Sequence, residues 1–269
     1  MIALHARRSA PSIHAWSAQH PGKPLIVVLT GTDLYRDIQT DTDAQRSLQL
    51  ATHLVVLQES GLTALPQDMQ DKAQVIFQSA SSLQPAVKSA QHFKVVMVGH
   101  LRDEKDPLTF MQAARLCAGV VDIDQIGDGL DAALADAARK TAAQVSGYRW
   151  LGGLPRAETR QRIKRAHVLV NCSLMEGGAH VILEAVQSAT PVLASHISGN
   201  VGMLGAGYSG YFETGDAPGL AGLLKRCATQ PAFLSHLQSQ CALRAELFDP
   251  AVERRLVLKL AASVCKEYP

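Results

Sequence analysis

Short apolar runs alternate with amphipathic segments along most of the chain, and this pattern predicts alternating strands and helices. In the first part of the chain, strands are predicted at Met1–His5, Leu25–Leu29, Leu54–Leu57 and Gln74–Phe77, and helices at Ala10–Gln19 and Ala44–Ala51. In the second part the alternation resumes from Lys94 to Gly153 and includes the alanine-rich helix Leu130–Val145. Such alternation is typical of parallel sheets joined by crossover helices. We therefore predict an α/β fold.

The polar, serine-rich stretch Ser79–His92 interrupts this alternation. Runs of small polar residues mark loops, so we expect this stretch to be a linker. It divides the chain into a first domain, residues 1–88, and a second domain, residues 89–245. Each domain is expected to contain its own parallel sheet.

The end of the chain is purely helical in pattern after Pro231. The pair Asp249-Pro250 predicts the start of a helix, because aspartate caps a helix and proline fits its first turn. The amphipathic segment Ala251–Lys266 that follows predicts one long terminal helix. Residues 246–269 are therefore expected to form a third unit.

Composition narrows the class of protein. The chain of 269 residues has a formal net charge of +2, and no basic run interleaved with aromatic residues points to nucleic acid as a partner. No apolar run reaches the roughly 18 residues that a membrane-spanning helix needs, and Met1–Arg8 lacks the order of a signal peptide. Five widely spaced cysteines fit reduced, buried thiols better than disulfides or a zinc site. We expect a cytoplasmic location.

The segment Cys172–Ala185 gives the strongest indication of function. It follows the predicted strand His167–Asn171, and Gly177 and Gly178 lie where this strand turns into a helix. Backbone amides at such a turn point outward, with the helix dipole behind them, and suit a phosphate group. The backbone of Gly177, Gly178 and Ala179 is therefore a candidate diphosphate site.

Two glutamates frame this turn. Glu176 directly precedes the glycines, and Glu184 lies within the helix, with seven residues between the two. A carboxylate buried in an apolar helix costs free energy unless it is paired or hydrogen-bonded. A ribose diol can donate two hydrogen bonds to one carboxylate. A ribose on Glu184 and a sugar near Glu176 would complete a nucleotide-sugar site. The alternative, a solvated helix with two unrelated glutamates, stays open on this segment alone.

Further segments of the second domain support the interpretation as a nucleotide-sugar site. They are Val96–Pro107, Gln125–Gly129, Arg149–Leu154, Thr190–Ser195 and Gly210–Asp216. Together with Cys172–Ala185 they resemble the retaining-type glycosyltransferases of the two-domain GT-B class, family 4, over most of residues 94–225. The resemblance implies two Rossmann-like domains whose parallel sheets face each other across a cleft, and a terminal helix that crosses back to the first domain.

The same resemblance implies roles on the donor side. The family's lysine contacts the donor diphosphate beside the glycine of the strand end, and these residues are Lys105 and Gly99 here. The family's usual arginine is replaced by His100, and Arg102 is expected to supply the missing cation. The strand end Trp150-Leu151-Gly152-Gly153 is expected to lie alongside the nucleobase, with Trp150 and Gly152 at the site. The alternatives are an exposed charged loop and a plain strand end.

The first domain departs from the family pattern. The family's opening strand, glycine-rich loop and helix are not recognisable before Met1–His5, so we expect a shortened, incomplete first domain. Thr30 stands where the family usually has a histidine, and a hydroxyl cannot serve as a general base near neutrality as imidazole can. An anionic nucleophile would not need a base. His5, Arg7 and Arg8 could bind such an acceptor, or His5 is a satisfied strand-end residue and both arginines are solvated.

At these positions the sequence resembles one subfamily, the selenosugar synthases of selenoneine biosynthesis. The similar segments are His5–Ala10, Leu29–Asp37, Gly99–Pro107, Met175–Ala179, Ser198–Gly202 and Gly210–Phe212. The resemblance implies formation of a carbon–selenium bond between a UDP-sugar, either UDP-N-acetylglucosamine or UDP-glucose, and selenophosphate. Candidate catalytic residues are Glu176, Thr30 and Arg7.

Three functions remain open on the sequence: the selenosugar synthase, an ordinary family 4 glycosyltransferase that acts on an alcohol, and a non-catalytic nucleotide-sugar-binding module. No cofactor is expected beyond the two substrates. Clustered acidic ligands of the Asp-x-Asp kind do not occur in a suitable loop, so we expect transfer without a metal ion.

Overall fold

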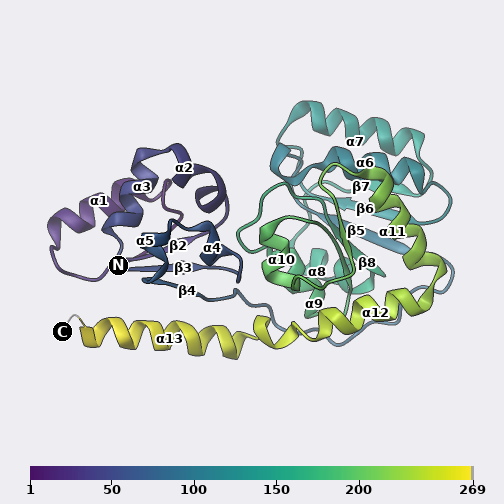
Figure 1. The fold of residues 1–269 in the computed structure, drawn as a ribbon. Coiled ribbons are helices and arrows are strands. Elements are labelled where there is room, and N and C mark those ends of the chain that lie inside the picture. The colour runs from purple at the N-terminus through teal and green to yellow at the C-terminus, as the bar shows by residue number, and fades with distance from the viewer. Residues whose placement is uncertain (268–269) are drawn as a thin grey trace.

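The computed structural model describes residues 1–267, which form two parallel sheets surrounded by helices (Figure 1). The first sheet has the order β1-β2-β3-β4, formed by β1 (Ile2–Leu4), β2 (Ile26–Leu29), β3 (His53–Val56) and β4 (Ala73–Val75). Its helices are α1 (Ala10–Gln19), the π-helical turn η1 (Asp33–Asp37), α2 (Ile38–Thr40), α3 (Thr42–Leu50), α4 (Gly61–Ala64) and α5 (Gln67–Gln70). Ile13 of α1 and Leu48 of α3 pack with Leu29 in one buried core.

The second sheet has six strands in the order β10-β9-β8-β5-β6-β7. They are β5 (Lys94–Val98), β6 (Asp122–Ile126), β7 (Tyr148–Trp150), β8 (Val168–Asn171), β9 (Val192–Ser195) and β10 (Tyr211–Phe212). The chain therefore builds outward from β5 to β7 and then returns to add β8 on the other side of β5. In open α/β sheets, ligands bind at the carboxyl ends of the strands where the order reverses in this way. That point lies between β5 and β8.

Helices cover both faces of the second sheet (Figure 1). They are η2 (Asp103–Lys105), α6 (Pro107–Leu116), α7 (Ala132–Gln144), α8 (Arg156–Arg165), α9 (His180–Val186), α10 (Ser198–Leu204), α11 (Ala217–Thr229), α12 (Pro231–Ala242) and η3 (Ala245–Phe248). α11 packs beside α6, and α8 packs beside α9. Phe110 and Met111 of α6 are fully buried in the core of this sheet.

The terminal helix α13 (Pro250–Glu267) returns to the first domain and runs along it (Figure 1). Leu260 and Val264 pack against Ile26, Val55 and Ile76 in a small third core. The amide of Ala251 donates to Asp249 Oδ1 over 2.7 Å, as the Asp-Pro start predicts. The helix thus starts at the Asp-Pro pair and lies against the first sheet.

The predicted strands and helices are confirmed, with shifts of one to two residues at most ends. The predicted strand Gln74–Phe77 extends two residues too far, because β4 ends at Val75. Ile76 and Phe77 are nevertheless buried, since Ile76 packs under α13 and Phe77 packs edge-on against Phe248 at 5.6 Å between ring centroids. Their apolar character therefore reflects packing beyond the sheet ladder.

The stretch Ser79–His92 contains no helix or strand, as predicted. Lys88 fastens it to the second domain, because its ammonium group donates to the carbonyl oxygens of Lys164 and Ala166 over 2.7 and 2.6 Å. Burial lowers the pKa of Lys88 to about 8, and the nearby charge of Lys164 adds to this shift. Within residues 1–267, no helix combines the length and the apolar character needed to cross a membrane.

Candidate active site

A cavity of about 560 Å³ is lined by the carboxyl ends of β5 and β6 and by the start of α9, which follows β8, so it borders the point between β5 and β8 where the strand order reverses. We call it the switch-point pocket. Its lining consists of Val98, Gly99, His100, Arg102, Lys105, Ile126, Gly127, Asp128, Gly153, Leu154, Thr159, Ala179, His180 and Val181. The structure thus brings together four residues that the sequence nominated for the donor, Gly99, Arg102, Lys105 and Ala179.

The floor of this pocket depends on a close approach of two loops. The amide of Gly99 donates to the Ile126 carbonyl over 2.8 Å and extends the β5–β6 ladder by one residue. Gly127 has a φ of +147°, and a Cβ there would lie 2.0 Å from the Gly99 carbonyl oxygen. Only glycine fits this position. The strand ends therefore meet closely enough to leave backbone groups at the base of the pocket.

Lys105 and Glu176 form the central ion pair of the site, with 2.5 Å between Nζ and Oε1. The same carboxylate oxygen accepts hydrogen bonds from Ser173 Oγ at 2.6 Å and Asn171 Nδ2 at 3.4 Å. Glu176 is buried, so these donors offset the cost of removing its charge from water. The loop after β5 and the loop after β8 are joined here, at the edge of the switch-point pocket.

Arg102 and His100 occupy the rim. The Arg102 side chain is 44% exposed, and the nearest carboxylate, that of Glu104, lies 3.9 Å away. His100 accepts a hydrogen bond at Nδ1 from the Asp128 amide at 3.1 Å. Arg102 therefore retains donors for a ligand, whereas His100 is engaged with the opposite wall of the pocket.

The two glycines of the turn lie against the first domain rather than in the pocket lining. A Cβ on Gly177 would lie 2.3 Å from the carbonyl oxygen of Thr30, and one on Gly178 would lie 2.7 Å from Cβ of Leu57. The sequence assigned both glycines to a diphosphate. Their small size is required here for contact between the domains, and the diphosphate role stays a prediction. Of the three turn residues, Ala179 lines the pocket.

Glu184 is buried and surrounded by cations. Its Oε1 lies 3.3 Å from Arg156 Nε, 3.8 Å from Arg160 Nε and 3.3 Å from His180 Nδ1. Burial tends to raise the pKa of Glu184, but hydrogen bonds and charges from His180 and Arg156 outweigh it and hold the pKa below its ordinary value. Glu184 does not line the pocket itself, but its neighbour His180 does. The ribose role of Glu184 stays a prediction.

Trp150 and Gly152 support the wall of the pocket from behind. The Trp150 indole donates to the Gly127 carbonyl over 2.9 Å, and the Gly127 amide donates to the Gly152 carbonyl over 2.8 Å. Neither predicted residue lines the cavity, whereas Gly153 does. Contact of Trp150 and Gly152 with a nucleobase stays a prediction.

On the first domain, Thr30 is exposed at the carboxyl end of β2, and its amide donates to Asp33 Oδ1 over 2.8 Å. Arg7 is paired with Asp41 at 3.0 Å and Asp37 at 3.8 Å. The structure brings Thr30 close to the turn at Gly177, next to Glu176. Arg7 stays in the first domain's own charge cluster, and its catalytic role stays a prediction.

His5 is a satisfied strand-end residue in this structure. Its Nδ1 accepts from the Arg8 amide at 3.2 Å, and its Nε2 lies 3.0 Å from Thr32 Oγ1. The residue is buried and has a φ of +71°, which is costly for a residue with a side chain. Both ring nitrogens are engaged, so His5 is not poised as a free base.

Several lining residues were not nominated individually by the sequence, among them Asp128 and His180, and Gly153 was named only as part of the strand end expected beside the nucleobase. All three lie inside segments that the resemblance had marked. The positions of Asp128 and Gly153 at the ends of β6 and β7 would have nominated them, because carboxyl strand ends meet at one edge of a parallel sheet. His180 follows the glycine turn directly, and no sequence pattern separated it from its apolar neighbours.

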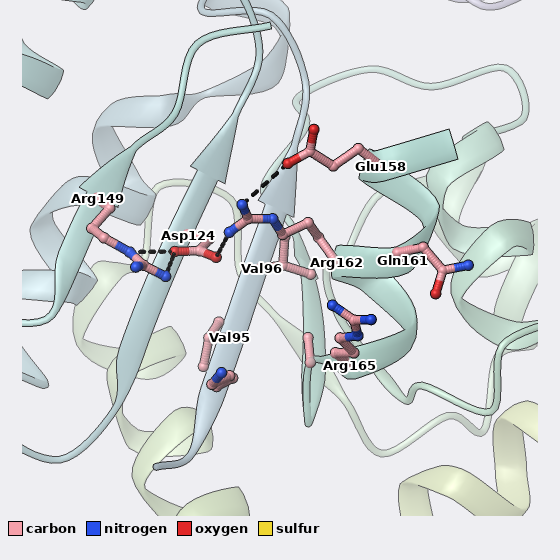
Figure 2. A pocket seen from close by; sticks show the side chains of 10 residues that line it. Val95, Val96, Asp124, Arg149, Glu158, Gln161, Arg162 and Arg165 are labelled. Carbon is pink, nitrogen blue, oxygen red and sulfur yellow. Dashed lines mark hydrogen bonds and ion pairs between the residues drawn. The ribbon is translucent and has the colours of Figure 1, made fainter. Parts of the chain in front are cut away.

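A second cavity, of about 370 Å³, lies on the face of the second sheet beside α8 (Figure 2). We call it the sheet-face pocket. Its lining consists of Lys94, Val95, Val96, Asp124, Arg149, Glu158, Gln161, Arg162, Arg165 and Ala166. Asp124 accepts from Arg149 over 2.6 Å and from Arg162 over 3.1 Å, and Arg162 also reaches Glu158 over 3.2 Å. Within residues 1–267, no group of three or more acidic, histidine or cysteine side chains is placed to hold a metal ion.

Comparison with known proteins identifies the family. Residues 82–238, more than half of the chain, match the model for glycosyl transferases group 1. The chain belongs to this family of transferases. It is 29% identical over 153 residues to glycosyltransferase 1 domain-containing protein 1 of Xenopus tropicalis, a match that covers 56% of this chain and 43% of that protein. The chain thus spans less than half the length of this relative.

Solved structures agree on the fold. HepE of Anabaena, in complex with UDP-glucose, matches with a TM-score of 0.80 and 15% identity, over 97% of this chain and 78% of that chain. The UDP-forming α,α-trehalose-phosphate synthase of Burkholderia vietnamiensis matches with a TM-score of 0.78 and 14% identity, over 98% and 75%. The predicted α/β fold of the GT-B class, with two parallel sheets, is confirmed.

Proposed function

We propose that the switch-point pocket binds a UDP-sugar and that the protein transfers its sugar to selenophosphate. Binding of the UDP-sugar is supported by the position of this pocket at the reversal of strand order. Lys105 and Arg102 lie on its wall. Both cations stabilise a bound diphosphate. Lysine contributes a compact positive charge, and arginine can donate two parallel hydrogen bonds to one phosphate group. HepE, which shares the fold, binds UDP-glucose.

The structure also supports an acceptor that brings its own negative charge. Thr30 offers only a hydroxyl at the end of β2, and this hydroxyl donates to Asp33 Oδ1 over 3.4 Å. Both ring nitrogens of His5 are engaged. An alcohol acceptor needs a base to remove its proton, whereas anionic selenophosphate does not. Within residues 1–267, the imidazole at the first domain's strand ends, that of His5, is bonded at both nitrogens, and this favours selenophosphate over an alcohol.

The proposed step forms one bond and breaks one. A selenium lone pair attacks the anomeric carbon, and the bond from that carbon to the diphosphate oxygen breaks. UDP leaves with the bonding electrons, and Lys105 and Arg102 stabilise the charge that develops on it. Glu176, at the pocket edge, would hold a hydroxyl of the sugar. We assign the reaction to the cytoplasm.

The test is UDP release from UDP-N-acetylglucosamine and from UDP-glucose, with and without selenophosphate. We expect release that depends on selenophosphate, together with a selenium-containing sugar detected by mass spectrometry. Release that requires an alcohol and ignores selenophosphate would assign the protein to ordinary glycosyl transfer. Binding of UDP-sugar without any release would leave a binding module in its place.

A further inference from the structure

The carboxylate of Glu176 is held asymmetrically. Lys105 Nζ, Ser173 Oγ and Asn171 Nδ2 all reach one oxygen, Oε1, at 2.5, 2.6 and 3.4 Å. Oε2 receives no hydrogen bond from the residues described, 1–267. A carboxylate accepts through both oxygens. One oxygen is therefore committed to the protein, and the other remains available to a ligand hydroxyl.

The two neutral donors are themselves fixed. Ser173 and Asn171 are buried, and the Ser173 amide donates to Asn171 Oδ1 over 3.0 Å. Ser195 Oγ donates to the Ser173 carbonyl over 2.5 Å, and Asn200 Nδ2 donates to the Ser195 carbonyl over 2.9 Å. This chain of buried hydrogen bonds leads from α10 to Glu176. These bonds fix the backbone of Ser173 at both its amide and its carbonyl group, and its hydroxyl reaches Glu176 from this fixed backbone.

Lys105 differs from these two donors, because it also lines the switch-point pocket. A diphosphate in that pocket competes with Glu176 for the lysine charge. When the lysine turns toward the phosphate, the carboxylate loses its strongest partner while it remains buried. Hydrogen bonds to an ionised group contribute more than those between neutral groups, so Ser173 becomes the principal donor that remains.

We propose that Ser173 is a positioning residue for donor recognition: it keeps the Glu176 carboxylate aimed at the sugar after Lys105 has turned to the diphosphate. Asn171 assists from the end of β8. This inference rests on the proposed UDP-sugar function. The inference assigns recognition of the two parts of the donor to different residues. Ser173 affects binding of the sugar through Glu176, and Lys105 binds the UDP portion.

The chain offers a matched control. Ser188 is 1% exposed, as Ser173 is, and its Oγ donates over 2.7 Å to the backbone carbonyl of Glu184 instead of a carboxylate. Ser173→Ala and Ser188→Ala remove the same hydroxyl from equally buried sites. A general loss of packing or folding would appear in both variants.

The experiment measures the dissociation constants of UDP and of UDP-N-acetylglucosamine by calorimetry, with UDP-glucose as a second donor. For Ser173→Ala we expect the affinity for UDP to stay within about twofold of the parent, and the affinity for the UDP-sugar to fall roughly tenfold, the loss of one charge-assisted hydrogen bond. Ser188→Ala should leave the ratio of the two constants unchanged. Ser173→Thr, which keeps the hydroxyl, should restore the ratio.

A double-mutant cycle completes the test. If Ser173 acts through Glu176, then Ser173→Ala should add little to the effect of Glu176→Gln, because coupled residues are not additive. Equal losses for UDP and UDP-sugar, or full additivity with Glu176→Gln, would overturn the positioning role. A parent protein that binds no UDP-sugar at all would instead overturn the proposed function, so the two failures are distinguishable.

Discussion

The switch-point pocket and the sheet-face pocket both have basic side chains in their lining, and they differ in how these cations are paired. In the sheet-face pocket, Arg149 and Arg162 are paired with Asp124 at 2.6 and 3.1 Å (Figure 2). In the switch-point pocket, the nearest carboxylate to Arg102 is 3.9 Å away, and Lys105 shares its charge with a carboxylate at the edge of the cavity. The number of cations therefore does not identify an anion site. Their place beside the carboxyl ends of the strands, at the reversal of strand order, does.

The largest effect should come from breaking the paired cavity. Asp124→Asn removes the charge that holds Arg149 and Arg162 together; it leaves Arg149 without its carboxylate and Arg162 with Glu158 alone. We expect a loss of about 1–3 kcal/mol in the free energy of unfolding, measured by urea denaturation, with unchanged affinity for UDP. A loss of UDP affinity in a folded Asp124→Asn variant would erase the distinction between the cavities.

Glu184→Gln should weaken binding of UDP roughly tenfold by calorimetry, because a neutral amide is a poorer acceptor for a ribose diol than a carboxylate. The variant also leaves Arg156 and Arg160 without a negative partner. Unchanged UDP affinity in a folded protein would remove Glu184 from the donor site.

The depressed pKa of Glu184 also predicts a pH dependence of stability. A lowered folded-state pKa means that the stabilising contribution is fully present above the ordinary value of 4.5 and is lost as the pH falls through the lower folded-state value. Glu184→Gln should flatten the acid limb of the curve of unfolding free energy against pH. An identical acid limb in parent and variant would contradict the assigned ion pairs.

Arg102→Ala should have a smaller effect than the loss of a buried partner. Its side chain is half-exposed, and an exposed ion pair contributes about 0.2–1 kcal/mol, which corresponds to at most about a fivefold loss of UDP affinity. The affinity for uridine should not change, since only the diphosphate feels this charge. Equal losses for UDP and uridine would place Arg102 outside the phosphate site.

At Thr30 the expected effect is small compared with the loss of a general base. Thr30→Ala should keep selenophosphate-dependent turnover within roughly tenfold of the parent, well short of the 10²–10⁴-fold that loss of a general base costs. Thr30→His should bring no gain in that reaction. A collapse to background activity in a folded Thr30→Ala variant would show that the hydroxyl takes part in the chemistry.

The fold was predictable because local patterns determine it, and apolar runs located the strands within two residues. The family resemblance nominated Gly99 and Lys105, and both line the switch-point pocket. The contact of Gly177 with Thr30 was not predictable, because it depends on how two separately folded sheets meet. The partners of Glu184 were hidden for a similar reason, since Arg156 and Arg160 lie in a polar helix without any motif.

The most direct test compares one lysine and one arginine from the two cavities. Lys105→Ala and Arg165→Ala each remove one cation, from the switch-point pocket and the sheet-face pocket respectively, and thermal melts confirm that both variants fold. By calorimetry, Lys105→Ala should weaken UDP at least about tenfold, the loss of one charge-assisted contact, and leave uridine unchanged. Arg165→Ala should alter neither. Undiminished UDP affinity in Lys105→Ala, or an equal loss in Arg165→Ala, would contradict a diphosphate site at the reversal of strand order.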